Sequence, residues 1–135
     1  REHRINFFYN YYHKNLGNFV KTKINKYKNV FLVSIHSFTK NSKNFNRGIE
    51  VGLLWNKSMD LLLPIQRYLK DKKIHFGRNY PYSGFHYNYT IDRLCMNFDL
   101  KNITIEIRND LICYQKGIKN YVKLMSNIFK EFLNE

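Results

Sequence analysis

The run from Val30 to Ile35 reads VFLVSI, and it constrains the fold more than any other segment of this chain. It is apolar except for Ser34 and lacks the alternation expected of a strand with one face in water. Such a run is typical of a strand that is covered on both faces, as in parallel sheets flanked by helices. We therefore predict a buried strand here, with His36, Ser37 and Phe38 following at its carboxyl end.

Hydrophobic spacing predicts the other elements. The predicted helices are Glu2–Lys28, Ser58–Lys73, Thr90–Phe98 and Ile118–Leu133, the further strands are Val51–Trp55 and Ile103–Arg108, and the loops are Thr39–Gly48 and Gly77–Asn88. We expect Gly17 to bend or split the first helix, Ser58 to cap the second, and Pro64 to disturb it. This order predicts one layered α/β domain over residues 1–135, in which helices cover a mixed or mainly parallel sheet.

Composition excludes several classes of protein. The chain has 135 residues, of which 44% are hydrophobic, so it can bury one core but hardly two. No apolar run approaches the roughly 18 residues that a membrane span needs, and no signal-peptide pattern is present. Cys95 and Cys113 are too few for a disulfide framework, and we expect both to be small buried hydrophobes. The sequence predicts a soluble, cytoplasmic protein without a membrane partner.

The net charge of +13 suggests nucleic-acid binding, because clustered bases displace counterions from phosphates. However, sixteen of the 23 basic residues are Lys, Asn occurs eighteen times, and Ala is absent. Residues with AT-rich codons are thus enriched, so a biased genome explains much of the charge. The bases are also scattered, without an Arg-rich block or a nucleic-acid motif. We keep nucleic-acid binding only as a second alternative.

Glu106 stands out among the polar residues because it lies between Ile105 and Ile107 in a predicted strand. An ionised carboxylate beside apolar neighbours must be paired, solvated or protonated. Arg108 shares its face of the strand, so a structural ion pair between the two is one alternative. His36 has a similar alternative as a hydrogen-bonded structural residue. If the strand is central, Glu106 is a functional candidate on physical grounds alone.

Five blocks follow one another along nearly the whole chain. They are YYH at Tyr11–His13, VSIHSFT at Val33–Thr39, NRGIEVGLL at Asn46–Leu54, RNYPYSG at Arg78–Gly84 and TIEIRNDLI at Thr104–Ile112. In this order they resemble the N-formylglutamate amidohydrolase family, which is related in fold to the zinc carboxypeptidases. The resemblance implies a zinc-carboxypeptidase-like α/β fold. It also implies zinc-assisted hydrolysis of the amide of an N-formyl or N-acyl amino acid.

The resemblance further implies roles for individual residues. By similarity, His36 would be a zinc ligand. Glu106 would be the general base, which takes a proton from zinc-polarised water and delivers it to the leaving amine. Arg47, or alternatively Arg108, would hold the substrate carboxylate through paired hydrogen bonds. The implied substrate-binding residues are Arg47, Asn79, Tyr82, Ser83 and Arg108.

The chain departs from the family pattern where the metal would bind. A catalytic zinc takes three protein ligands plus water, and relatives supply the others from an earlier segment. Residue 1 is Arg rather than Met, so we expect a carboxyl-terminal portion of the family fold that lacks its amino-terminal part. Leu94 occupies the place of a further family His. His3 and His13 lie too far apart on the predicted first helix to share a metal easily.

Two main hypotheses of function follow from these residues. The first is an amidohydrolase-like enzyme of small N-acyl amino acids, and the alternative is a truncated, non-catalytic scaffold or binding protein of the same fold. For this chain we expect little tightly bound zinc and negligible hydrolysis of N-formylglutamate. An incomplete domain would also expose sheet edge or core surface, so we expect self-association.

Overall fold

A mixed sheet of four strands forms the centre of the computed structural model, which describes residues 2–42 and 45–133. The strands lie in the order β1 (Phe31–Phe38), β6 (Lys101–Arg108), β4 (Val51–Leu54) and β5 (Phe76–Arg78). β1 is parallel to β6, whereas β4 is antiparallel to β6 and parallel to β5. The predicted α/β fold with a mixed sheet is thereby confirmed. The expectation about Arg1 lies outside the described residues.

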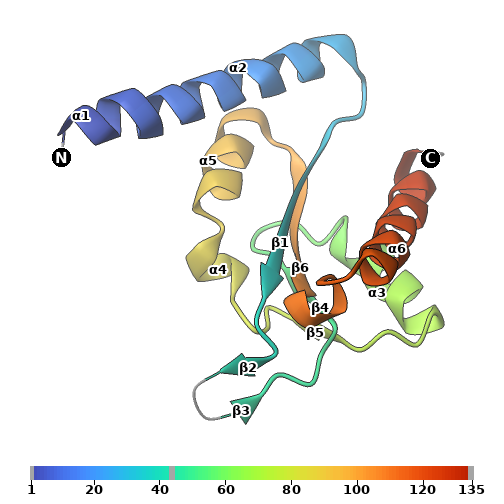
Figure 1. The fold of residues 1–135 in the computed structure, drawn as a ribbon. Coiled ribbons are helices and arrows are strands. Elements are labelled where there is room, and N and C mark those ends of the chain that lie inside the picture. Colours follow the sequence, from blue (N-terminus) through green and yellow to red (C-terminus); the bar gives the residue numbers. More distant parts are fainter. Residues whose placement is uncertain (1, 43–44, 134–135) are drawn as a thin grey trace.

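Helices lie on both sides of this sheet (Figure 1). The helical elements of the described chain are α1 (Glu2–Arg4), a π-helical segment (Ile5–Asn10), α2 (Tyr11–Lys26), α3 (Leu62–Asp71), α4 (Gly84–Tyr87), α5 (Tyr89–Phe98), a 3-10 turn (Asn109–Leu111) and α6 (Gln115–Leu133). In Figure 1, α3 and α6 lie on one side of the sheet, and α4 and α5 lie on the other. None of the helices in the described ranges is long and apolar enough to cross a bilayer.

The central strand β6 separates two kinds of surface. Its residues Ile103, Ile105 and Ile107 enter the hydrophobic core, together with residues of α3 and α6. The alternate residues Thr104 and Glu106 face the other side, and they are only 4% and 6% exposed. Both faces of β6 are therefore buried, although one of them is polar. This buried polar face positions the candidate site.

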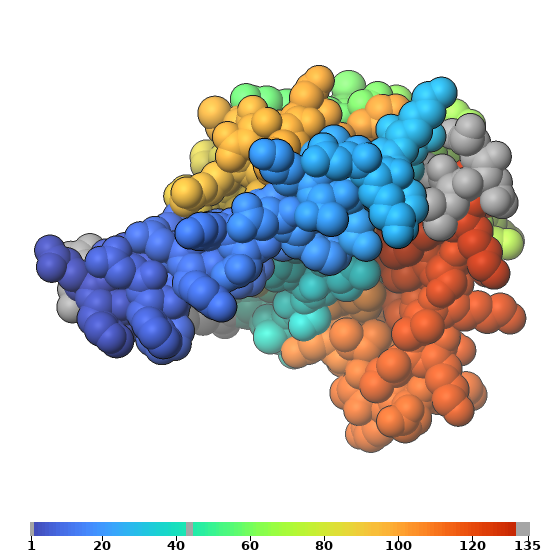
Figure 2. Space-filling model, turned by 90° about the horizontal axis from the view of Figure 1, so that it is seen from above, coloured from blue at the N-terminus to red at the C-terminus, as the bar shows by residue number. Residues whose placement is uncertain are grey.

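The prediction that β1 is covered on both faces is wrong. β1 is an edge strand, and its Ile35 side chain is 53% exposed. The first helix does not run along it, but lies across the end of the sheet at which β1 begins (Figures 1 and 2). The strand also continues to Phe38, so that His36 and Ser37 lie within it rather than after it.

Three local predictions about helices also need correction. α2 runs through Gly17 without a break. Ser58 does not cap α3, which begins at Leu62; its hydroxyl instead donates to the Asp60 carboxylate at 2.8 Å. Pro64 is tolerated because it lies in the first turn of α3, where a backbone N–H has no partner within the helix.

The two predicted loops contain short regular elements. β2 (Asn41–Ser42) and β3 (Phe45–Asn46) pair in antiparallel fashion within the first loop, whose residues 43 and 44 lie outside the described ranges. The second loop contains most of β5 and all of α4. The two cysteines also differ from expectation, because Cys113 is exposed and Cys95 is only partly buried.

Candidate functional site

A cavity of about 380 Å³ lies over the polar face of β6. The residues that line it are Ser34, His36, Leu54, Tyr82, Tyr87, Asn88, Tyr89, Thr90, Ile91, Thr104 and Glu106. The register of the parallel pair places His36 beside Glu106 and Ser34 beside Thr104. β1 and β6 thus form the floor of the cavity, with the ionisable side chains of His36 and Glu106 in one row and the hydroxyl groups of Ser34 and Thr104 in the next. Residues of α4, α5 and the preceding loop form the wall.

Glu106 has the properties of a proton carrier. Its side chain is 6% exposed, and its Oε2 atom has no hydrogen-bond partner in the described part of the chain. Burial raises the pKa of Glu106 above its usual value of 4.5, while the charges of His36 and Arg47 act in the opposite direction. A carboxyl group with a raised pKa can take up a proton and release it again under mild conditions.

Arg47 and Tyr82 come together beside this cavity, although they are distant in the sequence. The Arg47 guanidinium lies 5.1 Å from the centre of the Tyr82 ring and donates through Nη1 to the Tyr82 hydroxyl at 3.2 Å. The same atom also donates to the Thr39 carbonyl at 3.3 Å. Arg47 is 9% exposed, and its Nε has no partner among the described residues. It is therefore a buried cation with one free donor near Glu106.

Arg108 makes its hydrogen bonds outside the cavity lining. Its Nε donates to the Asp110 carboxylate at 2.7 Å, and its Nη1 donates to the Ile49 carbonyl at 3.0 Å. The proximity of Arg108 lowers the pKa of Asp110 below its usual value. Because Arg108 is engaged in this way, the alternative of a structural Glu106–Arg108 pair is wrong. The cavity lining does not include Arg108.

Asn79 and Ser83 hold the loop beside the cavity rather than line it. The Asn79 side-chain oxygen accepts from the backbone N–H of Trp55 at 3.0 Å and from that of Gly84 at 2.9 Å. The Ser83 hydroxyl caps α4 by accepting from the Phe85 N–H at 3.3 Å. Of the block that was expected to contact substrate, only Tyr82 lines the cavity within the described ranges.

Asn88 and Thr104 were missed in the sequence, although both are buried in the cavity lining. Thr104 could have been found from the two-residue period of a strand, because it precedes Glu106 by two positions and therefore shares the same face as Glu106. Asn88 gave no comparable signal, since it lies in a polar segment whose path depends on tertiary contacts. Its place at the junction of α4 and α5 brings it to the cavity.

The residues present do not make up a complete zinc site. A catalytic zinc takes three protein ligands, and no group of three His, Cys, Asp or Glu residues in the described ranges is arranged to hold a metal. Both ring nitrogens of His13 are engaged, Nδ1 with the Tyr9 carbonyl at 2.9 Å and Nε2 with the Thr90 hydroxyl at 3.3 Å. His3 stacks on Phe7, and Leu94 is a core residue. At the cavity, His36 is the imidazole that this chain offers.

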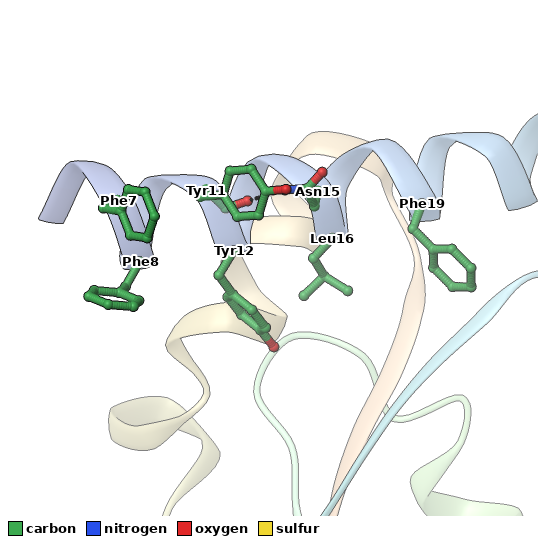
Figure 3. Close-up of a pocket in the computed structure, with 7 residues that line it drawn as sticks. All are labelled: Phe7, Phe8, Tyr11, Tyr12, Asn15, Leu16 and Phe19. Atoms are coloured by element: carbon green, nitrogen blue, oxygen red, sulfur yellow. Dashed lines mark hydrogen bonds between the residues drawn. The ribbon is translucent and has the colours of Figure 1, made fainter. Parts of the chain in front are cut away.

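A larger hollow lies on the first helix, away from Glu106. Its volume is about 860 Å³, and it is lined by Phe7, Phe8, Tyr11, Tyr12, Asn15, Leu16 and Phe19. Figure 3 shows the side chains of Phe8, Tyr12, Leu16 and Phe19 along one side of the helix. In α2 only Val20 is buried among the described side chains, so most of the apolar residues of this helix lie at the surface. This aromatic face carries no acid or base suited to hydrolysis.

The raised pKa of Glu106 predicts how a Glu106→Gln variant behaves with pH. Because the folded chain binds this proton more readily than the unfolded chain, Glu106 destabilises the fold only when it is ionised. The cost is absent below the usual pKa of 4.5 and grows as the pH rises through the higher folded-state pKa. We expect urea denaturation to show a stability gain of Glu106→Gln over wild type that increases with pH. A gain that decreases with pH would contradict the assigned direction.

Comparisons with known proteins bear on the family and the fold of the chain. The family model of N-formylglutamate amidohydrolase matches residues 1–113. A gene product of Agrobacterium tumefaciens of known crystal structure is 26% identical, with a TM-score of 0.76 over 89% of this chain and 50% of its own. The N-formylglutamate amidohydrolase from Ralstonia eutropha is 20% identical, with a TM-score of 0.66 over 94% of this chain and 49% of its own.

These matches differ in what they show. At 20% identity the Ralstonia enzyme shows only that the fold is shared. The chain spans about half the length of these two solved relatives. No curated protein matches the sequence. The family match covers most of the chain, however, and from it we conclude that this chain belongs to the N-formylglutamate amidohydrolase family.

Proposed function

We propose that the Glu106 cavity binds N-acyl amino acids and that Glu106 is the proton carrier for hydrolysis of their amide bond. The observation that carries this proposal is the buried Glu106 carboxyl, which has a raised pKa and one oxygen without a hydrogen-bond partner in the described part of the chain. Family membership supports the same class of substrate. The likeness to zinc carboxypeptidases stays a prediction, as does the cytoplasmic location.

Hydrolysis of the amide bond requires two successive transfers of one proton. Glu106 takes a proton from a water molecule while the water oxygen attacks the acyl carbon. The protonated Glu106 then donates to the amide nitrogen as the C–N bond breaks. The products are a carboxylic acid, which is formic acid for an N-formyl substrate, and the free amino acid. Burial favours the protonated form of Glu106, and this assists the first transfer, in which Glu106 takes up the proton.

Arg47 is the proposed partner of the substrate carboxylate. Its Nε is buried without a partner among the described residues, while Nη1 holds Tyr82, which lines the cavity. A charge-assisted hydrogen bond from a guanidinium to a carboxylate is about twice as strong as a neutral one. Arg47 therefore suits the fixed carboxylate of an amino acid. Arg108 suits it less, because its Nε and Nη1 are already engaged and it does not line the cavity.

His36 stays the proposed zinc ligand. One imidazole falls short of the three protein ligands that a catalytic zinc takes. Glu106 is placed to carry the proton, but without further zinc ligands we expect this chain to bind substrate while holding little zinc and hydrolysing N-formylglutamate negligibly. Stoichiometric zinc in elemental analysis, together with turnover that Glu106→Gln abolishes, would contradict this expectation and would favour an active enzyme over a non-catalytic scaffold.

Calorimetric titration of the 135-residue chain with N-formyl amino acids tests the binding proposal. We expect saturable binding that weakens about tenfold in Arg47→Gln, because a charge-assisted hydrogen bond contributes about 1.5–3 kcal/mol. Arg67→Gln is the matched control, because Arg67 is exposed on α3. Absence of binding, or an equal loss in both variants, would contradict the proposal.

Two other hypotheses about partners stay predictions. Self-association is supported by the edge position of β1 and by the exposed aromatic face of the first helix. Nucleic-acid binding is supported only by the net charge of +13. A complex that disappears by about 0.2 M salt would be the non-specific electrostatic kind.

A further inference from the structure

Much of the wall of the Glu106 cavity is one short stretch of chain, where α4 is joined to α5. Five consecutive residues of this stretch line the cavity, namely Tyr87, Asn88, Tyr89, Thr90 and Ile91. Side chains that must be ordered when a ligand arrives reduce its affinity, whereas side chains already held in place do not. The contacts that hold this wall therefore bear on the binding proposed above.

The side chain of Thr90 is bonded to the first helix. His13 Nε2 lies 3.3 Å from Thr90 Oγ1, and the other ring nitrogen, Nδ1, lies 2.9 Å from the Tyr9 carbonyl oxygen. A carbonyl oxygen can only accept a hydrogen bond, so Nδ1 carries a proton. In the neutral ring Nε2 is then the acceptor, and the Thr90 hydroxyl donates to it. The bond to His13 thus fixes the direction of a hydroxyl that belongs to the cavity lining.

Tyr89, the neighbouring wall residue, is bonded to the same part of the first helix. The Tyr9 hydroxyl donates to the Tyr89 hydroxyl, and Arg93 of α5 donates through Nη1 to the Tyr9 hydroxyl at 3.2 Å. The bond between the two tyrosines raises the pKa of Tyr9 and lowers that of Tyr89. The His13 and Tyr89 rings also meet edge to face, with 6.0 Å between their centroids. Two adjacent wall residues are therefore both held by the first helix, which lies beside α5 in Figure 1.

Tyr9 and His13 act together because they are four residues apart on a helix. Their ring centroids are 4.3 Å apart, and the Tyr9 carbonyl fixes the His13 ring. Neither residue belongs to the cavity lining of the described chain. We propose that Tyr9 and His13 are positioning residues of the Glu106 cavity, which hold Tyr89 and Thr90 in place for the ligand. This inference rests on the proposed function, because it concerns binding in the same cavity.

Calorimetric titration of the full chain with N-formyl-L-glutamate tests the positioning role. His13→Phe keeps an aromatic ring but removes the acceptor for Thr90. We expect its dissociation constant to rise about fivefold, because the wall must then be ordered on binding. Tyr9→Phe should weaken binding in the same direction. His3→Phe is the matched control, because His3 is exposed on the same helix and stacks on Phe7, and it should bind as wild type does.

A double-mutant cycle separates positioning from a general loss of stability. Thr90→Val conserves the shape of the side chain and removes its hydroxyl, so the bond to His13 is already lost in this variant. Adding His13→Phe to Thr90→Val should therefore weaken binding no further. His13→Gln retains an amide oxygen that can accept from Thr90, and it should restore most of the affinity. All titrations are made where circular dichroism shows the variants to be folded.

The outcomes distinguish this inference from the proposed function. Wild-type affinity in His13→Phe, an equal loss in His3→Phe, or additive losses in the double variant would overturn the positioning role alone. Tyr9→Phe provides the comparison if His13→Phe fails to fold. Absence of binding to wild type would overturn the proposed function. In that case the ring ¹⁵N shifts of His13 in the ligand-free chain still decide the arrangement: the Nδ1–H tautomer supports it, and the Nε2–H tautomer overturns it.

Discussion

Replacing Gly84 with Ala should lower the free energy of unfolding by about 3 kcal/mol, the upper part of the range for overpacked sites. A Cβ atom at Gly84 would lie 2.4 Å from the Trp55 carbonyl oxygen and 2.7 Å from the Trp55 nitrogen. Both atoms belong to the backbone next to β4, so neither can rotate away as a side chain would. The first turn of α4 would have to move instead. Urea denaturation followed by circular dichroism measures the loss.

Gly17→Ala is the matched control for this variant. No atom lies within 4 Å of a Cβ built at Gly17, which is inside α2. Ala is the better helix former, so this variant should gain about 0.5–1 kcal/mol. The same added methyl group is thus expected to change stability in opposite directions at the two sites. A Gly84→Ala variant as stable as wild type would show that α4 is not held against Trp55.

Replacing Asn79 with Ala should cost about 2–4 kcal/mol, because two partly buried donors lose their acceptor at once. These donors are the backbone N–H groups of Trp55 and Gly84, at 3.0 and 2.9 Å from the Asn79 side-chain oxygen. Asn79 also has a φ of 47°, a conformation that Asn tolerates better than Ala. Asn79→Asp keeps the acceptor, and we expect it to retain most of the stability.

The same pair of variants separates a structural role of Asn79 from the substrate contact that the family resemblance implies. A structural role predicts that Asn79→Ala unfolds at a lower urea concentration than Asn79→Asp. A substrate contact predicts normal stability with weakened binding of N-formyl amino acids. Stability of Asn79→Ala within about 0.5 kcal/mol of wild type would therefore contradict the structural role.

The order of the elements could be predicted because each helix and strand carries its own hydrophobic spacing. α5 begins at Tyr89, next to the predicted start at Thr90, and β4 begins at Val51 as predicted. Short elements could not be predicted in this way. The three residues of β5, for example, include Gly77 and show no hydrophobic periodicity. Regular spacing needs several residues to become visible, whereas pairing with β4 is enough to form β5.

The position of β1 in the sheet could not be predicted from its composition. An apolar run indicates that side chains need cover, but it does not indicate which element provides the cover or on which side. Val33 packs against the core, while Ile35, two residues further, is exposed. Strand order is a property of the whole chain, and here it places β6 rather than β1 at the centre.

The candidate site was predictable only along β6. The apolar neighbours of Glu106 marked it as unusual, and the two-residue period of a strand, although it was not applied to Thr104, places Thr104 on the same face. Tyr82 and Asn88 reach the same cavity from a distant loop, which is held by Asn79 and by the close approach of Gly84 to Trp55. Such long-range contacts leave no periodic signal in the sequence.

The edge position of β1 also has a consequence for the motions of the cavity floor. In a parallel edge strand, alternate amides either bond to the neighbouring strand or point away from the sheet. β1 bonds only to β6 among the described strands, so hydrogen exchange should alternate between slow and fast amides along it. The floor of the cavity thus joins β6, which is bonded on both sides and carries Glu106, to β1, which is bonded to β6 alone among the described strands and carries His36.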